Sequence, residues 1–348
     1  MDGLRLFPEA EGSVDYGTRL WEQLRPIAPG DPLVLDLFAG CGGLALGFES
    51  AGFRTHGFEM DAHYAATYRL NLEGECTEEF LTPDSELPES ATVIIGGPPC
   101  QPFSVRGAQK GGGDSRDGFP TFLSAVSRIR PKLALIENVR GMLYRNRPYL
   151  DDVVSELEEM GYEVDFKLLN AKDFGVPQNR ERVIIVAHLG GWKWPSPDTG
   201  KLVSAGEALG EMAFEAPEES KFLTPSMDQY VAEYERKSGC ARPRDLHLDR
   251  PARTLTCRNL AGSTSDMQRI RLPDGRRRRL LLREAARLQS FPDWFEFTGG
   301  EQSAFYQVGN SVAPLFALKL ATSAREYLDL LPQSSELSSV PTAEELPG

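Results

Sequence analysis

Short apolar runs alternate with stretches of helical spacing between about residues 32 and 189. The runs are too short for buried helices and predict strands, whereas apolar residues three and four positions apart predict amphipathic helices. The alternation predicts an α/β fold with a doubly wound parallel sheet. The predicted strands are Pro32–Phe38, Arg54–Glu59, Thr92–Gly96, Lys132–Val139, Val164–Asn170 and Arg182–His188, and the predicted helices between them are Gly42–Ala51, Asp61–Leu72, Phe122–Arg130 and Tyr149–Met160.

The alternation stops after His188, where a polar, proline-containing stretch extends to about Pro225. A domain boundary is expected there, followed by a smaller second domain. Two further helical patterns, Leu282–Gln289 and Val312–Leu330, predict a segment that returns to pack on the sheet. The expected division is an N-terminal extension (1–30), a first domain (31–189), a second domain (190–278), a returning segment (279–330) and an acidic, disordered tail (331–348).

Composition narrows the class of protein. The chain has 348 residues, of which 41% are hydrophobic and 26% charged, as in folded globular proteins. No apolar run approaches the roughly 20 residues of a membrane span, and the first residues lack a basic-then-apolar export signal. The five cysteines form no CxxC pair, which argues against disulfides and a zinc cluster. We therefore expect a cytoplasmic protein without a metal.

The charge distribution is uneven. The net charge is −13, yet the window from Cys240 to Ser290 holds 13 Arg and no Lys against 4 Asp and 1 Glu. This window carries +8 and the remaining chain −21. Arginine without lysine indicates contacts with phosphates or base edges. For the run Arg276–Arg279 alone, a solvated surface explains the charge equally well.

The first motif is DLFAGCGGL at Asp36–Leu44, a glycine turn between a predicted strand and a helix. Such a turn brings backbone close to a ligand, and an acidic residue about 20 positions later, here Glu59, can accept hydrogen bonds from a ribose. Nicotinamide dinucleotides and S-adenosylmethionine both carry such a ribose. Gly40, Gly42 and Ala45 also match G-x-G-x-x-A, so a dehydrogenase remains open, as does a packing turn without a ligand.

Three further motifs place reactive side chains at strand ends. Cys100, in IIGGPPCQPFS, is a candidate nucleophile, and Glu137, in LIENVRG, a candidate acid or base at the same sheet edge. Gln178, Arg180 and Arg182, in VPQNRERV, alternate along an extended segment and are expected to point into one cleft. The alternatives are a buried structural thiol, a capping carboxylate and an ion-pair ladder.

Together, and in this order, these motifs resemble the DNA (cytosine-5) methyltransferase family. The resemblance rests on FAGCGGL, GGPPCQPFS, ENVRG, QNRER, RLLLREAARLQSFPD (279–293) and QVGNSVAP (307–314), and covers about residues 32–189 and 279–320. It implies a Rossmann-like S-adenosylmethionine-dependent methyltransferase sheet, with a target recognition domain at 190–278.

The resemblance also implies a mechanism. Cys100 would add to carbon 6 of cytosine, which makes carbon 5 electron-rich enough to accept a methyl group. Glu137 would face the ring nitrogen and exocyclic amine, and Arg182, helped by Arg180, would face the carbonyl oxygen. The base would be flipped out of duplex DNA. S-adenosyl-L-homocysteine would be the product.

By the same resemblance, the cofactor lies between the glycine turn and the Cys100 segment. Glu79 stands where the family usually has an Asp that holds the adenine amine. The implied cofactor-binding residues are Phe38, Ala39, Gly40, Cys41, Gly43, Glu59, Met60, Glu79, Pro99, Asn310, Ser311 and Val312.

DNA contacts are expected from two regions. The glycine-rich stretch 106–118 is expected to close over the extruded base, with Arg106 or Gln109 entering the helix, although a surface loop without function is the alternative. Thr254 and Leu255 resemble the family's Thr-Leu signature, and Arg269 and Arg271 are further candidates for guanine edges or phosphates. The predicted DNA-binding residues are Arg106, Gln109, Gln178, Arg253, Thr254, Leu255 and Arg258.

Alternatives remain at this point. A transfer RNA cytosine-5 methyltransferase of the same fold shares these motifs, whereas a nicotinamide-dependent oxidoreductase explains only the glycine turn. A noncatalytic DNA-binding protein would not need Cys100, Glu137 and Arg182 together. The expected protein is a prokaryotic, stand-alone monomer that acts on duplex DNA at the nucleoid, with a restriction endonuclease as a separate partner.

Overall fold

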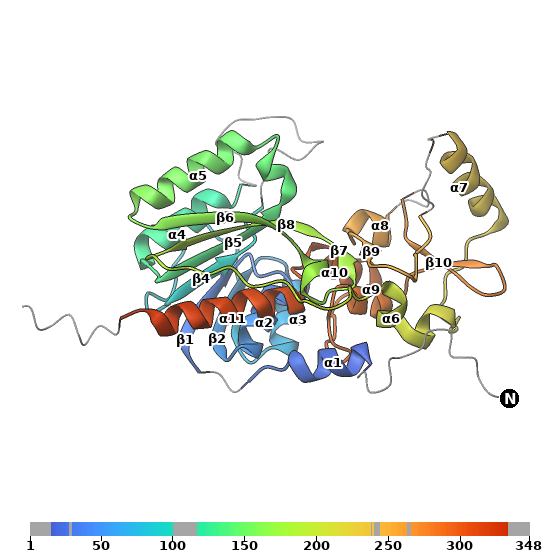
Figure 1. The fold of residues 1–348 in the computed structure, drawn as a ribbon, viewed down its shortest axis with the longest axis horizontal. Helices are drawn as coiled ribbons and strands as arrows, with labels where there is room; N and C mark the ends of the chain where they lie inside the picture. Colours follow the sequence, from blue (N-terminus) through green and yellow to red (C-terminus); the bar gives the residue numbers. More distant parts are fainter. Residues whose placement is uncertain are drawn as a thin grey trace, which may run out of the picture.

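The computed structural model describes residues 15–27, 30–99, 117–237, 239, 244–262 and 266–332 (Figure 1). Cys100, Arg106, Gln109 and the tail after residue 332 lie outside them. The described part holds a seven-stranded sheet of order β3-β2-β1-β4-β5-β8-β6. Its strands are β1 (Gly30–Leu37), β2 (Phe53–Glu59), β3 (Glu75–Glu78), β4 (Val93–Gly96), β5 (Leu133–Val139), β6 (Glu163–Asn170) and β8 (Glu181–His188).

The sheet confirms the predicted α/β class with one correction, because β8 runs antiparallel to both of its neighbours. Only about ten residues separate β6 from β8, and they hold a 3₁₀ turn, η2 (Ala171–Phe174), and the two-residue strand β7 (Gln178–Asn179). A parallel pair needs a crossover of a dozen or more residues. The short connection therefore forces the antiparallel pairing.

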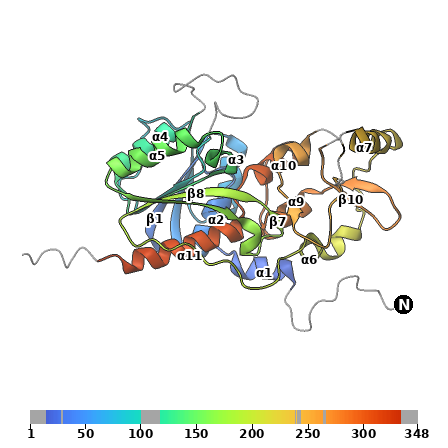
Figure 2. The same ribbon diagram turned by 45° about the horizontal axis from the view of Figure 1, so that its top comes forward.

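Two helical layers cover the sheet (Figures 1 and 2). On one face lie α2 (Gly43–Ser50), α3 (Ala62–Asn71) and α11 (Pro314–Leu330), which pack with β1 around Phe48, Tyr68 and Phe316. On the other face lie α4 (Phe119–Ile129) and α5 (Arg147–Glu159), around Phe122 and Leu157. The returning helix therefore packs on the sheet as predicted.

After β8 the chain forms short helices and strands that lie beside the seven-stranded sheet and are not part of it (Figure 1). The large hydrophobic cluster of the sheet runs on into this region through Leu209, Leu255 and Ile270. Trp192 is also buried in it, in edge contact with Trp194 and Tyr327. The elements are α6 (Ala205–Leu209), η3 (Gly210–Phe214), α7 (Pro225–Lys237), β9 (Ala252–Arg253), α8 (Cys257–Ala261), β10 (Arg269–Arg271), β11 (Arg277–Arg279), α9 (Leu282–Leu288) and α10 (Glu301–Asn310).

The N-terminal extension also contributes. A helix, α1 (Tyr16–Gln23), begins at Asp15, whose carboxylate accepts hydrogen bonds from the backbone N–H groups of Gly17 and Thr18. This is an ordinary N-cap. Leu20 and Leu24 of this segment are fully buried in the same cluster, so residues 15–27 of the extension belong to the folded core.

Candidate active site at the carboxyl edge of the sheet

Register brings the two predicted catalytic strand ends together. Gly96, the last residue of β4, pairs with Ile136 of β5, so Gly97 and Glu137 follow side by side at the carboxyl edge. A Cβ added to Gly97 would lie 3.3 Å from Glu137 Oε2, so this glycine leaves the room in which the carboxylate sits. The strand order reverses between β1 and β4, and such switch points are where open α/β sheets bind ligands.

Glu137 and Arg182 form an ion pair across β5 and β8. Arg182 Nε lies 2.6 Å from Glu137 Oε1, and the two side chains are 12% and 11% exposed. Arg182 also donates from Nη1 to the carbonyl of Glu181, at 2.8 Å. The pair is largely buried and charge-assisted, so it presents a fixed donor and a fixed acceptor to a molecule that enters from the sheet edge.

The chain leading to the predicted nucleophile is held on both sides. Asn138 Nδ2 donates to the carbonyl of Pro98 at 2.9 Å, and the N–H of Gly118 donates to the carbonyl of Pro99 at 3.0 Å. Cys100 follows directly, outside the described residues. Asn138 was not among the predicted site residues, although its place beside Glu137 in the ENV motif was the available signal. It fixes the backbone from which Cys100 continues.

The glycine turn after β1 is tied to the acidic residue predicted from the sequence. Gly40 has a φ of 58° and donates its N–H to Glu59 Oε2 at 2.9 Å, while Glu59 Oε1 accepts from the N–H of Asp61 at 2.8 Å. Phe38 also lies in the left-handed region, with a φ of 61°, a strained backbone that is common at ligand sites. Burial raises the pKa of Glu59.

A cavity of about 720 Å³ extends from the glycine turn to Glu137, the carboxylate of the catalytic pair. A second cavity adjoins it on the side of Glu79 and Met60, and Phe38, Glu59 and Pro99 line both. All twelve predicted cofactor-binding residues line one or both of these cavities. The first is lined by Phe38, Ala39, Gly40, Cys41, Gly43, Glu59, Pro99, Glu137, Asn138, Asn310, Ser311 and Val312 among others, and the second also by Met60, Glu79, Phe80 and Leu81.

Two further titratable side chains of this wall, Asp36 and Cys41, are almost completely buried. Asp36 is 1% exposed, its Oδ2 has no partner among the described residues, and burial raises its pKa well above the usual range. Cys41 lies 3.8 Å from the hydroxyl of Ser311, and burial raises its pKa to about 12. Cys41 is therefore a neutral packing thiol.

The QNRER segment does not place all three polar side chains in the cavity. Gln178 is fully buried; its Oε1 accepts from the N–H of Leu255 at 2.9 Å, and its Nε2 donates to Gln289. Arg180 donates to the carbonyl of Leu255 at 2.9 Å. Both backbone groups of Leu255 are thus held. A direct contact between Gln178 and DNA is not available in this conformation, and of the three residues only Arg182 reaches the ion pair with the carboxylate.

Arg180 is a buried positioning residue. Its Nη2 donates to the carbonyls of Gly309 and Ser311, at 3.2 and 2.8 Å, and the residue is 2% exposed. Burial, and next the nearby Arg182, lower its pKa. Arg180 therefore joins β8 to Leu255 and to the Asn310–Val312 wall of the cavity, and its described contacts do not bring it to the catalytic pair.

Comparison with known proteins now decides the family. The family model described as "C-5 cytosine-specific DNA methylase" matches residues 33–326. The chain belongs to this family. It is 56% identical over 301 residues to the Type II methyltransferase M.AplI of Arthrospira platensis, covering 86% of this chain and 87% of the relative. It is 33% identical to M1.HphI of Haemophilus parahaemolyticus, over 82% and 85% of the two chains.

Solved structures agree on the fold of this C-5 cytosine methylase. A protein assigned as a DNA modification methyltransferase, encoded within an E. coli prophage, matches with a TM-score of 0.62 and 22% identity, over 86% of this chain and all of its own. A DNMT2 of Spodoptera frugiperda matches with a TM-score of 0.64 and 17% identity, over 86% and 100%. The protein is a C-5 cytosine DNA methyltransferase of the restriction-modification type, and the dehydrogenase alternative loses its support.

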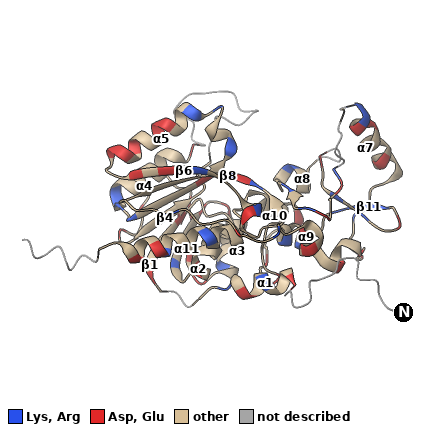
Figure 3. Cartoon of the chain, viewed as in Figure 1, with Lys and Arg blue, Asp and Glu red and all other residues tan. Residues whose placement is uncertain are grey.

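Charge in the arginine-rich region of the methylase is more balanced than the window count predicts (Figure 3). Carboxylates from outside the Cys240–Ser290 window, such as Asp228 and Glu235, help to neutralise its arginines. Arg277 pairs with Asp228 and Asp245, at 2.8 and 2.9 Å. Arg269, a predicted DNA contact, is fully buried between Asp245 and Glu235, and for that reason is corrected to a structural role.

The predicted contacts Thr254 and Leu255 differ in access. Thr254 is partly exposed, and its hydroxyl donates to the carbonyl of Asn179 at 2.7 Å, whereas Leu255 is fully buried. Arg258 is 62% exposed and pairs with Asp266 at 3.0 Å. Arg271 is 57% exposed and lies 3.5 Å from Asp245. Among the predicted described residues, the exposed arginines are thus the ones with access to DNA.

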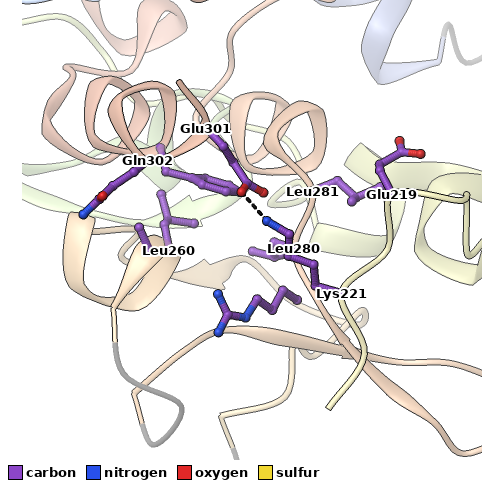
Figure 4. Close-up of a pocket in the computed structure, with 10 residues that line it drawn as sticks. Glu219, Lys221, Leu260, Leu280, Leu281, Glu301 and Gln302 are labelled. Atoms are coloured by element: carbon purple, nitrogen blue, oxygen red, sulfur yellow. Dashed lines mark hydrogen bonds and ion pairs between the residues drawn. The ribbon is translucent and has the colours of Figure 1, made fainter. Parts of the chain in front are cut away.

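A separate hollow lies between α8, α10 and the chain around residue 220 (Figure 4). An ion pair between Lys221 and Glu301 lies in it, and Leu260 and Leu280 form part of its wall. None of the predicted catalytic or cofactor residues lines it. The described ranges contain no group of three or more residues able to hold a metal, and no helix in them is long and apolar enough to cross a membrane.

Proposed function

We propose that this protein transfers the methyl group of S-adenosylmethionine to carbon 5 of a cytosine flipped out of a specific duplex DNA sequence, through a Cys100 adduct at carbon 6. The observation that carries the proposal is the Glu137–Arg182 pair, whose Glu137 lines the same cavity as the glycine turn and Glu59. An acid and a cation fixed beside the start of the Cys100 segment match the polar edge of cytosine.

The cavity fits S-adenosylmethionine. Gly43 lets the start of α2 pack directly against the Ser311–Val312 wall of the cavity, since a Cβ there would lie 2.0 Å from the serine hydroxyl. Glu59 keeps lone pairs for a ribose diol, and Phe38, Met60 and Glu79 would hold the adenine. When bound, the cofactor supplies an electrophilic methyl group.

The side chains would then act on the base as follows. As the base enters, the Glu137 carboxylate takes up a proton from solvent. The Cys100 thiolate then forms a bond to carbon 6 while Glu137 passes this proton to ring nitrogen 3, and Arg182 donates hydrogen bonds to the carbonyl oxygen, where negative charge develops. After methylation, loss of the carbon-5 proton to a base expels the Cys100 thiolate, and ring nitrogen 3 returns its proton to Glu137. Arg180 positions the wall and Asn138 the nucleophile segment.

The remaining predictions of domains and partners stay within this proposal. Residues 190–278 would form the target recognition domain, attached to the sheet through the bonds to Leu255. The protein would act as a monomer, with a cognate restriction endonuclease acting separately. Light scattering of the protein alone and with duplex DNA tests the monomer.

Parallel transfer assays test the proposal. Labelled methyl groups from S-adenosylmethionine should enter duplex DNA and not total transfer RNA, and bisulfite sequencing should reveal one recognition sequence. Label only in RNA would overturn the substrate, and label in neither would overturn the activity.

The adduct has its own test. Cys100→Ser should abolish turnover and retain DNA binding, and duplex DNA with 5-fluorocytosine at the target should trap a covalent complex, because fluorine is not lost as a proton is. Methylation by the serine variant, or no mass shift on Cys100 in an active preparation, would refute the covalent step.

A further inference from the structure

Three arginine side chains converge on a single carboxylate, that of Asp266. Arg258 Nε lies 3.0 Å from Oδ2, while Arg253 Nη1 and Arg244 Nη2 lie 3.5 and 3.6 Å from Oδ1. Arg253 also donates to the backbone carbonyl of Asp266. These four residues, here named the Asp266 cluster, carry three positive charges against one negative charge.

The Asp266 cluster is short of acceptors. The Nε atoms of Arg244 and Arg253 are buried without a partner among the described residues. Burial, and next the neighbouring Arg244, lower the pKa of Arg253. The arginines around Asp245 differ, because three of them (Arg269, Arg271 and Arg277) face three carboxylates (Asp228, Glu235 and Asp245). The excess of positive charge therefore favours an electronegative ligand at this cluster, and Arg258, which is 62% exposed, is the member that a ligand can reach.

The Asp266 cluster lies beside the mouth of the catalytic cavity. Cys257, which precedes Arg258 in α8, has its sulfur 3.0 Å from Asn310 Oδ1, and Asn310 lines the cavity. Thr254, which follows Arg253, is bonded to Asn179, three residues before Arg182. α8 thus carries basic charge beside the site (Figure 3). If DNA delivers a base to the cavity, these two links would bring its neighbouring base pairs close to this cluster.

The geometry of Arg258 matches a base edge. Its Nε is held by Asp266, which leaves the two terminal nitrogens at the end of a 62% exposed side chain. Guanine offers two acceptors, O6 and N7, to such a fork in the major groove. A phosphate needs charge but no fixed fork, whereas a buttressed guanidinium adds the orientation that base reading requires.

We propose that Arg258, oriented by Asp266, reads one guanine of the recognition sequence from the major groove, with Arg244 and Arg253 as the surrounding positive charge. This inference rests on the proposed function, because it takes duplex DNA as the substrate. Asp266 is then a positioning residue for specificity. Asp266 was not predicted from the sequence, because the sequence alone does not show that three arginines separated from it along the chain share its carboxylate.

The experiment compares wild type, Arg258→Ala, Arg258→Lys and Asp266→Asn, with Arg250→Ala as the matched control. Arg250 is 58% exposed and pairs with its own neighbour, Asp249, at 3.0 Å. Bisulfite sequencing of a methylated DNA library gives each variant's recognition sequence. kcat/KM is then measured on the cognate duplex and on duplexes in which each guanine in turn is replaced by 7-deazaguanine, which lacks the N7 acceptor.

At one guanine, 7-deazaguanine should lower the wild-type kcat/KM, and Arg258→Ala should abolish that sensitivity and reduce discrimination against the other bases by about 5- to 150-fold. Arg258→Lys should not restore the sensitivity to 7-deazaguanine. Asp266→Asn should weaken this sensitivity while leaving the melting temperature near that of Arg250→Ala. A uniform loss of affinity with a salt slope smaller by about one would overturn guanine reading in favour of a phosphate contact. Unchanged specificity in Arg258→Ala would overturn the inference alone, whereas a wild type that methylates no DNA would overturn the proposed function and the inference with it.

Discussion

Replacing Arg180 by Met tests how the catalytic wall and the second half of the chain are joined. The guanidinium makes three hydrogen bonds of 2.8 to 3.2 Å to the carbonyls of Leu255, Gly309 and Ser311, and it is 2% exposed. Met keeps the apolar stem and removes every donor. The three carbonyls would then be left without this partner in an interior that water does not reach.

The magnitude follows from these contacts. A buried acceptor that loses its partner costs about 1–3 kcal/mol. The carbonyl of Ser311 keeps a second donor, Gln289 Nε2 at 2.6 Å, so the loss falls mainly on the carbonyls of Leu255 and Gly309. Part of the loss is offset by relief of a buried charge, whose burial already lowers the pKa of Arg180. We therefore expect Arg180→Met to lower the free energy of unfolding by about 2–4 kcal/mol.

Urea unfolding measures this difference, provided that the m value is unchanged. The matched control is Arg140→Met, which breaks an exposed ion pair with Glu181 at 2.8 Å and should cost about 0–1 kcal/mol. Arg180→Lys should lie between the two, because one ammonium group cannot reach three carbonyls. If Arg180→Met is no less stable than Arg140→Met, the reasoning about the buried bonds is wrong.

Three shorter predictions concern the cofactor wall. Burial raises the pKa of Asp36, so the wild type loses stability as pH rises from the pKa of the unfolded state through that of the folded state. The melting temperature of Asp36→Asn should therefore exceed that of wild type by an amount that grows between pH 5 and 8. The same change at the exposed Asp84 should show no such trend. Gly43→Ala should lower the melting temperature and prevent S-adenosylmethionine binding in calorimetry, because the added Cβ would lie 2.5 Å from the carbonyl of Val312. Gly141→Ala is the control and should do neither, because its added Cβ would meet only one atom, at 3.9 Å. Burial also raises the pKa of Glu59, so cofactor affinity should fall with decreasing pH at a higher pH than an ordinary Glu would give. Affinity that falls only in the ordinary Glu range, or that does not depend on pH, would refute the assigned role.

The strands were predictable because each buried strand is an apolar run, as in Val93–Gly96, where all four residues are buried. The strand β3 (Glu75–Glu78) was missed because it lies at the sheet edge and reads ECTE, with one buried residue in four. The direction of β8 was readable from the short link after β6, but apolar patterns alone carry no direction.

The meeting of Glu137 with the Cys100 segment was predictable for a related reason, since parallel strands end at one edge and each motif follows a strand. The partners of the individual side chains could not be predicted in this way. Alternation along QNRER predicts that Gln178, Arg180 and Arg182 share one side, and it says nothing about whether that side meets solvent or backbone carbonyls. Packing against α9 and α10 buries two of them, and only the third reaches the catalytic carboxylate.

The arginine window shows the same limit in electrostatic terms. A count of charges along the chain sums over residues that the fold separates, and it leaves out carboxylates from elsewhere that the fold brings in, such as Asp228 and Glu235. What attracts DNA is the charge left after this pairing, and that charge depends on tertiary contacts. By this criterion Arg269 drops out, because it is buried and its group of three arginines (Arg269, Arg271 and Arg277) faces three carboxylates (Asp228, Glu235 and Asp245). Arg258 remains, because it is exposed and shares one carboxylate with two other arginines. Specificity in this methylase is therefore expected to depend on where neutralisation is incomplete, and not on where arginine is most frequent.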